Sequence, residues 1–452
     1  MRYTAPHCGG GLIQDVSAVQ LGPEYWSQAR NILFENGAAK RVDGYTLFNA
    51  ATGTPIHAVA VQAGANYYWV YANDAGNILA YDGAIEDNIN RGGGTDEYST
   101  IPTKWTSDVL GGILVLNNGV DTPQYWASAS LATDLADLTA WTADLPANTT
   151  CGALRSYRDF LIALDLTENG AEFPYRMRWS NPAISGTVPS SWDEGDPATL
   201  AGFYDFSQTN GYVIDGGAVN DAFIVHKSDS IWRAQWVPSP EVFAFSLISN
   251  ETGVLSTNCL QTYKGVQFGI MQGDVVACDG LSIRSIIDKR NRDYLFRNID
   301  SENFDRTFLG LDTANSRLMV CYPQQGSTFP DSALIYDIEQ DTWGQRDIPN
   351  LHHIANGIVD PGESQLVDDY NDLVDSNDGF VDALSFNPSE VSTLWASNDG
   401  NLYKGDEGDT ANGVAMTGTV TRQDITLDGS LHTRNMITQV VPQITGSEGL
   451  SV

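Results

Sequence analysis

The sequence predicts an all-β fold, a β-propeller of about six or seven antiparallel blades. Three observations lead to this prediction. Short apolar runs rich in aromatic and β-branched residues recur along the chain, separated by turn residues, as in successive hairpins. The composition suits short strands joined by tight turns, with 43 glycines, 10% aromatic residues and only 18% charged residues. Tryptophans recur at intervals close to the length of one propeller blade.

Seven apolar runs carry the hairpin pattern. In the first run, the turn falls at Asn73-Asp74-Ala75-Gly76, between two apolar stretches. A two-stranded hairpin is barely stable alone, so seven of them need to pack on one another, which radial stacking achieves. A β-sandwich with a second β domain is the alternative arrangement. The runs cover Tyr67–Gly83, Gly112–Trp126, Asp159–Ser180, Asp221–Val237, Val266–Gly280, Ser316–Trp343 and Ser392–Gly405.

Six of the eleven tryptophans follow the same repeat. They lie about one blade apart, except for one gap of about two blades that contains the fifth hairpin, which has no tryptophan. They do not all fall on the same strand of their hairpins, so this periodicity is supporting evidence only. These residues are Trp69, Trp126, Trp179, Trp232, Trp343 and Trp395.

The runs divide the chain into three parts. Residues 1–48 are expected to form an N-terminal arm that leads into the first blade. Residues 49–410 are expected to form the propeller, with an acidic insertion at 359–382. Residues 411–452 are expected to form a short extra β segment at the C-terminus.

The charge balance limits the partners of the protein. The chain has 24 Lys and Arg against 57 Asp and Glu, a formal net charge of −33. A negative electrostatic field of this size repels the phosphate backbone of nucleic acids, so we expect no tight binding of DNA or RNA. DNA could still slide past such a surface. Five cysteines without a C-x-x-C motif predict free thiols in a reducing cytoplasm. No window approaches 18 consecutive apolar residues, and we expect no signal peptide or membrane anchor.

Motifs for catalysis are not found. The sequence has no phosphate-binding G-x-x-x-x-G-K-[ST], no G-x-S-x-G and no H-E-x-x-H. His352 and His353 are neighbours on a predicted strand and point to opposite faces, which disfavours a shared metal ion. The stretch Asp375–Gly379 resembles the start of a calcium loop but lacks its spacing and its closing glutamate, so a solvated acidic loop is favoured. We therefore expect no enzyme, no catalytic residue, no metal and no cofactor.

Two charged segments are candidate interaction sites. In the first, basic residues alternate with acidic ones, a pattern more typical of an ion-paired subunit interface than of a DNA-binding stripe. The second is the acidic insertion, a candidate lumen-facing or docking loop, with a solvent-exposed outer loop as the alternative. The interface candidates are Arg284, Lys289, Arg290, Arg292, Arg297 and Arg306. The loop candidates are Asp360, Glu363, Asp368, Asp369, Asp372, Asp375, Asp378 and Asp382.

Several motifs resemble one family. Residues Gly9–Tyr45 combine a glycine-rich start, Leu21-Gly22-Pro23, an Asn-x-x-Phe-Glu-x-Gly pattern and a basic pair before Gly44-Tyr45. This segment resembles the opening of tail nozzle proteins of short-tailed bacteriophages, also called tail tubular protein B or packaged-DNA stabilisation proteins. Three later stretches are similar to the same family: Arg176–Trp192, Asn250–Gly280 and Ala333–Asp347.

The resemblance implies a virion structural protein, a tail nozzle or tail-tube adaptor. It implies a β-propeller subunit in a homo-oligomeric ring, commonly a hexamer, at the distal end of the tail tube. The ring would contact other tail proteins, such as the tail adaptor and fibres, and let DNA pass without specific binding. Assembly would take place in the host cytoplasm. The alternatives are a receptor- or glycan-binding propeller of a phage tail and a propeller glycosidase, for which only fragments of the sialidase turn motif are present.

Overall fold

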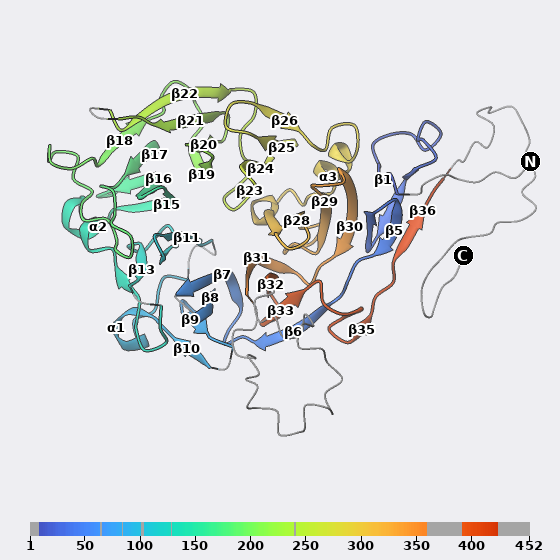
Figure 1. Cartoon of the computed structure of the whole chain (residues 1–452), viewed down its shortest axis with the longest axis horizontal. Helices are drawn as coiled ribbons and strands as arrows, with labels where there is room; N and C mark the ends of the chain where they lie inside the picture. The colour runs from blue at the N-terminus through green and yellow to red at the C-terminus, as the bar shows by residue number, and fades with distance from the viewer. Residues whose placement is uncertain are drawn as a thin grey trace, which may run out of the picture.

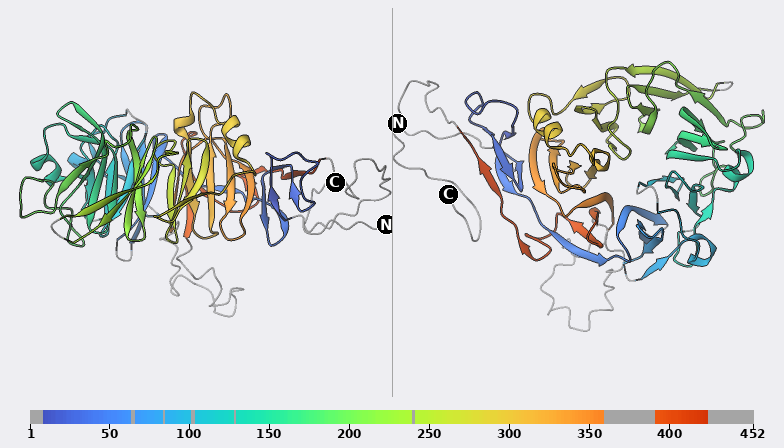
Figure 2. Two further views of the ribbon diagram at one scale, coloured as in Figure 1. Left: turned by 90° about the horizontal axis from the view of Figure 1, so that it is seen from above. Right: turned by 180° about the vertical axis from the view of Figure 1, so that it is seen from behind.

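The computed structural model describes residues 9–63, 66–83, 85–100, 104–127, 129–238, 241–358 and 391–423. In this part of the chain, seven antiparallel sheets of at least four strands stand around a common centre (Figure 1). Seen edge-on, they form a disc with a flank of short strands beside it (Figure 2). The predicted all-β propeller is confirmed, and it has seven blades.

Blades 1 to 4 are four-stranded, and in each the chain runs from the innermost strand outward. Blade 1 contains β7 (Pro55–Ala63), β8 (Asn66–Asn73), β9 (Ile78–Tyr81) and β10 (Glu86–Asn88). Blade 2 contains β11 (Thr106–Leu110), β12 (Ile113–Asn117), β13 (Gln124–Trp126) and β14 (Ala136–Asp137). Blade 3 contains β15 (Thr150–Tyr157), β16 (Phe160–Glu168), β17 (Ala171–Trp179) and β18 (Gly202–Asp205). Blade 4 contains β19 (Val213–Val219), β20 (Ala222–Lys227), β21 (Ile231–Trp236) and β22 (Phe243–Ser249).

Blade 5 is also four-stranded, whereas blades 6 and 7 are extended by strands from both ends of the chain. Blade 5 contains β23 (Leu260–Tyr263), β24 (Val266–Met271), β25 (Asp274–Cys278) and β26 (Ile283–Ser285). Blade 6 contains β27 (Phe308–Asp312), β28 (Arg317–Tyr322), β29 (Ser332–Asp337), β30 (Thr342–Asp347), β4 (Ile32–Glu35) and β5 (Ala38–Arg41). Blade 7 contains β31 (Leu351–Ile358), β32 (Val391–Ser397), β33 (Asn401–Gly405), β6 (Tyr45–Ala50), β34 (Thr410–Ala411) and β35 (Val414–Ala415). The helices are α1 (Arg91–Gly94), α2 (Thr139–Asp144), α3 (Arg292–Asn298) and the 3-10 turn η1 (Phe304–Arg306).

The two ends of the chain close the ring together. Strand β6 pairs antiparallel with β33, so the fourth strand of blade 7 comes from residues 45–50, just before blade 1 begins. Strand β6 therefore crosses the boundary predicted at residue 48. Strand β6 continues along the chain into blade 1, so its hydrogen bonds to β33 hold the last blade beside the first. The edge of β33 is therefore paired at this junction, the seam between blades 7 and 1.

A flank of short strands covers the outer side of blade 6. Strand β1 (Gly11–Leu12) pairs in parallel with β2 (Tyr25–Trp26), and β3 (Gln28–Arg30) pairs with β36 (Thr419–Thr421). Segments from both the predicted N-terminal arm and the predicted C-terminal segment thus lie side by side (Figure 1). Asp15 anchors the flank, because its carboxylate accepts the backbone N–H groups of Asp293 and Tyr294 in the first turn of α3, at 2.8 and 2.9 Å.

The predicted hairpins are the middle strands of the blades. Each apolar run spans the second and third strands of one blade, such as β28 and β29 in blade 6, whose residues are all buried. Neighbouring blades cover these strands on both faces, so their sequences are continuously apolar. The six periodic tryptophans are buried as well, on second, third or fourth strands.

Two further predictions concern the chain as a whole. Cys151, Cys259, Cys278 and Cys321 are all free and buried, and burial raises the pKa of each thiol. Among the residues that the structure describes, no helix has the length and apolar character needed to cross a membrane.

Candidate functional site

Polar side chains link neighbouring blades around the propeller axis. His57 on β7 contacts the hydroxyl of Ser107 on β11, with 2.8 Å between Nε2 and Oγ. Asp108 on β11 accepts the backbone N–H of Ser156 on β15 at 2.7 Å. These contacts join blades 1, 2 and 3 in sequence. They hold the inner strands as one rigid unit.

The strongest link joins blades 3, 4 and 5. Arg155 donates from Nε and Nη2 to the two carboxylate oxygens of Asp215, at 2.8 and 2.7 Å, and from Nη2 to Oδ1 of Asn258 at 3.1 Å. Burial alone would raise the pKa of Asp215, but attraction by Arg155 and backbone N–H donors hold this pKa below its ordinary value. Asp215 therefore stays ionised at the axis.

Two imidazole rings meet at the seam between blades 7 and 1. The ring centroids of His353 and His57 lie 4.2 Å apart. Burial lowers the pKa of His353 to about 4, and burial together with His353 lowers the pKa of His57 well below its ordinary value. Both rings are thus neutral at pH 7, and they serve to pack the seam.

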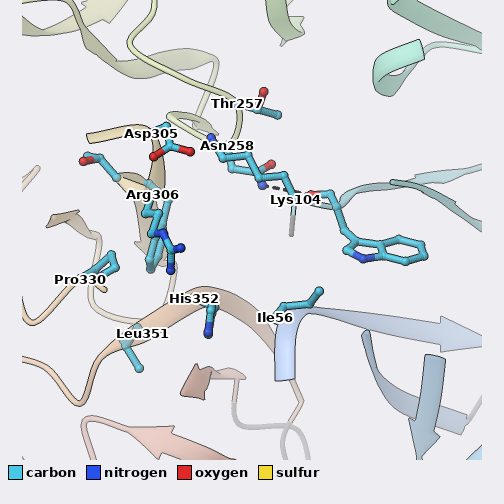
Figure 3. A pocket seen from close by; sticks show the side chains of 12 residues that line it. Ile56, Lys104, Thr257, Asn258, Asp305, Arg306, Pro330, Leu351 and His352 are labelled. Carbon is cyan, nitrogen blue, oxygen red and sulfur yellow. Dashed lines mark hydrogen bonds between the residues drawn. The ribbon is translucent and has the colours of Figure 1, made fainter. Parts of the chain in front are cut away.

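A small polar cavity, here called the axial cavity, opens at the face where the inner strands begin. Its volume is about 40 Å³, which is more than the roughly 10–15 Å³ that one water molecule needs. Three basic side chains line it from three blades: Lys104 before β11, Arg306 before β27 and His352 on β31 (Figure 3). The remaining lining residues are Ile56, Trp105, Thr257, Asn258, Asp305, Thr307, Phe308, Pro330 and Leu351.

The arginines of the stretch Arg176–Trp192 form a buried ion network in blade 3. Glu168 accepts from Arg176 at 3.3 Å and from Arg178 at 3.1 Å. Arg178 also donates to Glu194 at 2.6 Å, which ties the loop after β17 to the blade. Arg176 binds both carboxylate oxygens of Asp205 on β18. In this chain the motif performs a structural task, since each guanidinium is held by carboxylates.

The structure separates the predicted interface residues into two groups. Arg284 lies on β26, the outermost strand of blade 5, Lys289 follows it in the connection to α3, and both are exposed. Neither forms an ion pair within the described ranges. Arg306 lies apart from them, at the axial cavity.

The other three candidates form ion pairs with carboxylates of the same chain. Arg290 binds both carboxylate oxygens of Asp341, at 2.9 and 2.6 Å. Arg292 binds Asp274 at 2.8 Å. Arg297 lies 3.9 Å from Asp293, on the exposed side of α3. Arg290 therefore links the segment before α3 to blade 6 and Arg292 links α3 to blade 5, whereas Arg297 pairs within α3.

Other predicted site residues fall outside the described residues. These are the loop candidates Asp360, Glu363, Asp368, Asp369, Asp372, Asp375, Asp378 and Asp382. In the described part of the chain, no group of three or more His, Cys, Asp or Glu side chains is arranged to hold a metal ion.

Sequence reasoning missed the residues at the axis. Lys104, Arg155, Asp215 and Asn258 are far apart in the chain and share no motif. A weak signal was present at Lys104, because it and Arg91 are the only lysine or arginine residues between positions 50 and 150.

Comparisons with known proteins give only low-scoring structural similarities. No protein-family profile matches the chain, and no curated protein matches it either. Among solved structures, the WD40 β-propeller domain of Doa1 is similar with 10% identity and a TM-score of 0.41, over 80% of this chain and 96% of that one. PorZ, a bacterial surface component of the type-IX secretion system of Porphyromonas gingivalis, has 10% identity and a TM-score of 0.43, over 84% of this chain and 39% of that one. These similarities give no basis for assigning a function.

Proposed function

We propose that this chain is a structural protein of a bacteriophage virion, a tail nozzle or tail-tube adaptor that assembles with copies of itself into a ring. It works without catalysis or cofactor, and DNA passes it without specific binding. The resemblance of Gly9–Tyr45 and three later stretches to the tail nozzle family supports this assembly. A charge difference across the disc supports the ring, and it is the observation that carries the proposal.

The two charged rims lie on opposite sides of the propeller. In a ring of seven blades, the point opposite blade 5 falls between blades 1 and 2 (Figure 1). The rim of blade 5 presents the exposed cations Arg284 and Lys289 together with the exposed carboxylates Asp279 and Asp288, so its charges balance. The rim of blades 1 and 2 presents exposed carboxylates with Arg91 as the basic residue among them. These carboxylates include Asp87 on β10, Asp96 and Glu97 after α1, and Asp134 before β14.

Exposed cations on the rim of blade 5 and an acidic rim on blades 1 and 2 favour head-to-tail contact between copies. Such a contact uses two different patches, and it closes into a ring when the rotation between copies allows it. Complementary charge would steer the encounter and set its orientation. Most other surfaces are acidic in a chain of net charge −33, so copies in other orientations would repel one another.

Microscopy of the purified full chain tests the proposal. We expect negative-stain images and mass photometry at low salt to show rings of about six copies, and images of the virion to show the ring at the distal end of its tail. Raising the salt concentration should weaken assembly, because exposed charges are screened over about 8 Å at 0.15 M. A chain that stays monomeric at low salt would contradict the ring.

Charge reversal tests the contact itself. The double variant Arg284→Glu, Lys289→Glu should lose assembly while keeping the fold. The control Arg158→Glu changes an exposed cation on blade 3 and should assemble normally. Adding Asp87→Lys and Asp134→Lys to the double variant should restore assembly. Full assembly of the double variant would exclude this contact.

The receptor- or glycan-binding alternative is favoured by exposed aromatic rings on blades 3 and 4. Tyr175 is 40% exposed, Tyr212 54% and Trp236 36%. Exposed rings of this kind often stack on sugars or on partner side chains. Binding of the monomer on a glycan array, lost in Tyr212→Ala and Trp236→Ala, would favour this function.

A further inference from the structure

Two cations in the axial cavity have no partner in the described part of the chain. Lys104 and Arg306 both line the cavity, and neither side chain makes a hydrogen bond or an ion pair there. The guanidinium of Arg306 lies over the ring of Phe329, 4.3 Å from its centroid. Asp305 lines the same cavity but is paired with neither cation. The N–H donors of both side chains are therefore free to bind a ligand.

Lys104 and Arg306 are half-buried, whereas the unpaired cations Arg284 and Lys289 are exposed. Acidic residues outnumber basic ones by 57 to 24, so carboxylates are plentiful. Buried guanidinium groups elsewhere are each held by a carboxylate, as in Arg155 with Asp215, Arg178 with Glu168 and Arg346 with Asp406. The axial cavity thus holds two cations, Lys104 and Arg306, that form no ion pair with any described residue, with the carboxylate of Asp305 beside them.

The positive charges also act on one another. Burial and the charge of Arg306 both lower the pKa of Lys104, against the attraction of Asp305 and Asp215. Burial lowers the pKa of His352, and Arg306 lowers it further. An anion placed between these groups would offset the repulsion by Arg306, while burial would continue to lower both pKa values.

The shape of the cavity indicates the kind of anion. Lys104 comes from blade 2 and Arg306 from blade 6, so N–H donors reach the cavity from two sides (Figure 3). The Nε2 of His352, from blade 7, is engaged with Oδ1 of Asn398 at 3.2 Å. A tetrahedral anion accepts hydrogen bonds from all sides, whereas a carboxylate accepts them near one plane. The cavity is small, with a volume of about 40 Å³, which favours a small anion.

Asn258 provides a fixed wall for this site. Its carboxamide donates to the backbone oxygen of Trp105 at 3.0 Å and accepts from Arg155 at 3.1 Å. Its backbone N–H donates to Asp215 at 3.0 Å. The wall is therefore preorganised, and binding would order only the Lys104 and Arg306 side chains.

We propose that the axial cavity binds a small tetrahedral oxyanion, phosphate or sulfate, between Lys104 and Arg306. The ligand would bridge blades 2 and 6 across the axis. The site does not depend on ring formation, since all its residues come from one chain.

Calorimetric titration of the full chain with inorganic phosphate tests this proposal, with ionic strength held constant by chloride. We expect one site per chain, with sulfate binding within a few-fold of phosphate and acetate at least tenfold more weakly. Lys104→Met and Arg306→Met should each weaken phosphate binding at least tenfold. The matched control Lys289→Met removes an exposed cation on the rim of blade 5 and should bind as the natural chain does.

Thermal unfolding separates loss of the site from loss of the fold. Without phosphate, Lys104→Met should melt at or above the temperature of the natural chain, because an unpaired cation is removed. With phosphate, only chains that keep both cations should gain stability. No heat of phosphate binding to the natural chain, unchanged affinity in both variants, or tighter binding of acetate than of phosphate would each overturn the proposal.

Discussion

Arg155 of blade 3 and Asp215 of blade 4 form a two-bond ion pair at the propeller axis, at 2.8 and 2.7 Å. Asp215 is fully buried, so this pair is isolated from solvent on the carboxylate side. The guanidinium also reaches the backbone oxygen of Ser107 in blade 2, at 3.2 Å. One side chain thus holds several blades in position.

Removing the guanidinium should strongly destabilise the fold. In Arg155→Met, the carboxylate of Asp215 stays buried without its cation, which typically costs about 3–5 kcal/mol. Urea denaturation should show this loss in the free energy of unfolding. The control Arg297→Met removes a surface pair and should change stability by less than about 0.5 kcal/mol. A loss below about 1 kcal/mol in Arg155→Met would show that the pair is unimportant.

The stability of the protein should fall in mild acid through its buried histidines. His226 is fully buried, and burial lowers its pKa to about 4 despite a 2.7 Å contact with Gln267. In the unfolded chain its pKa is about 6.5, so the unfolded state takes up more protons as pH falls from 6.5 towards 4. His226 should therefore contribute a loss of roughly 2 kcal/mol between pH 7 and pH 5.

The variant His226→Gln isolates this contribution. Its free energy of unfolding should decrease less between pH 7 and pH 5 than that of the natural chain, whatever its stability at pH 7. Equal pH dependence in the two chains would show that His226 is not the titrating group.

The ion network of blade 3 should depend more on its buried glutamate than on its exposed one. Glu168 has a side chain only 10% exposed and serves both Arg176 and Arg178, whereas the Glu194 side chain is 40% exposed. We expect Glu168→Gln to cost about 3 kcal/mol and Glu194→Gln about 1 kcal/mol or less. Chemical denaturation of both variants measures the loss in free energy of unfolding, which should be larger for Glu168→Gln. Equal losses in the two variants would contradict this prediction.

Adding one methyl group to β33 should disturb the closure of the ring. A Cβ at Gly405 would lie 2.3 Å from the indole of Trp395, which is fully buried. Gly405→Ala should therefore cost about 1–3 kcal/mol in thermal or chemical unfolding. In the control Gly195→Ala, the new Cβ meets only the tip of the Asp193 side chain, at 3.1 Å. Full stability of Gly405→Ala would mean that the seam can rearrange.

The propeller could be predicted from the sequence because its signal is local. The middle strands of each blade, such as β16 and β28, are covered on both faces, so seven apolar runs appear in the chain at blade-length intervals. Several outer strands, such as β10, β14 and β26, have only two or three residues, and the sequence left the blade number open between six and seven.

Other features depend on contacts between distant residues, and only the tertiary structure decided them. Strand β6 closes blade 7 by pairing residues 45–50 with residues 401–405, which no local pattern indicates. Arg155 with Asp215, and Lys104 with Arg306, come together because the ring brings the starts of different blades to one axis. The sequence by itself determined which residues form blades, since burial requires apolar side chains there. The pairing of charges was decided by ring closure, since electrostatic contact depends on distance in space and not along the chain.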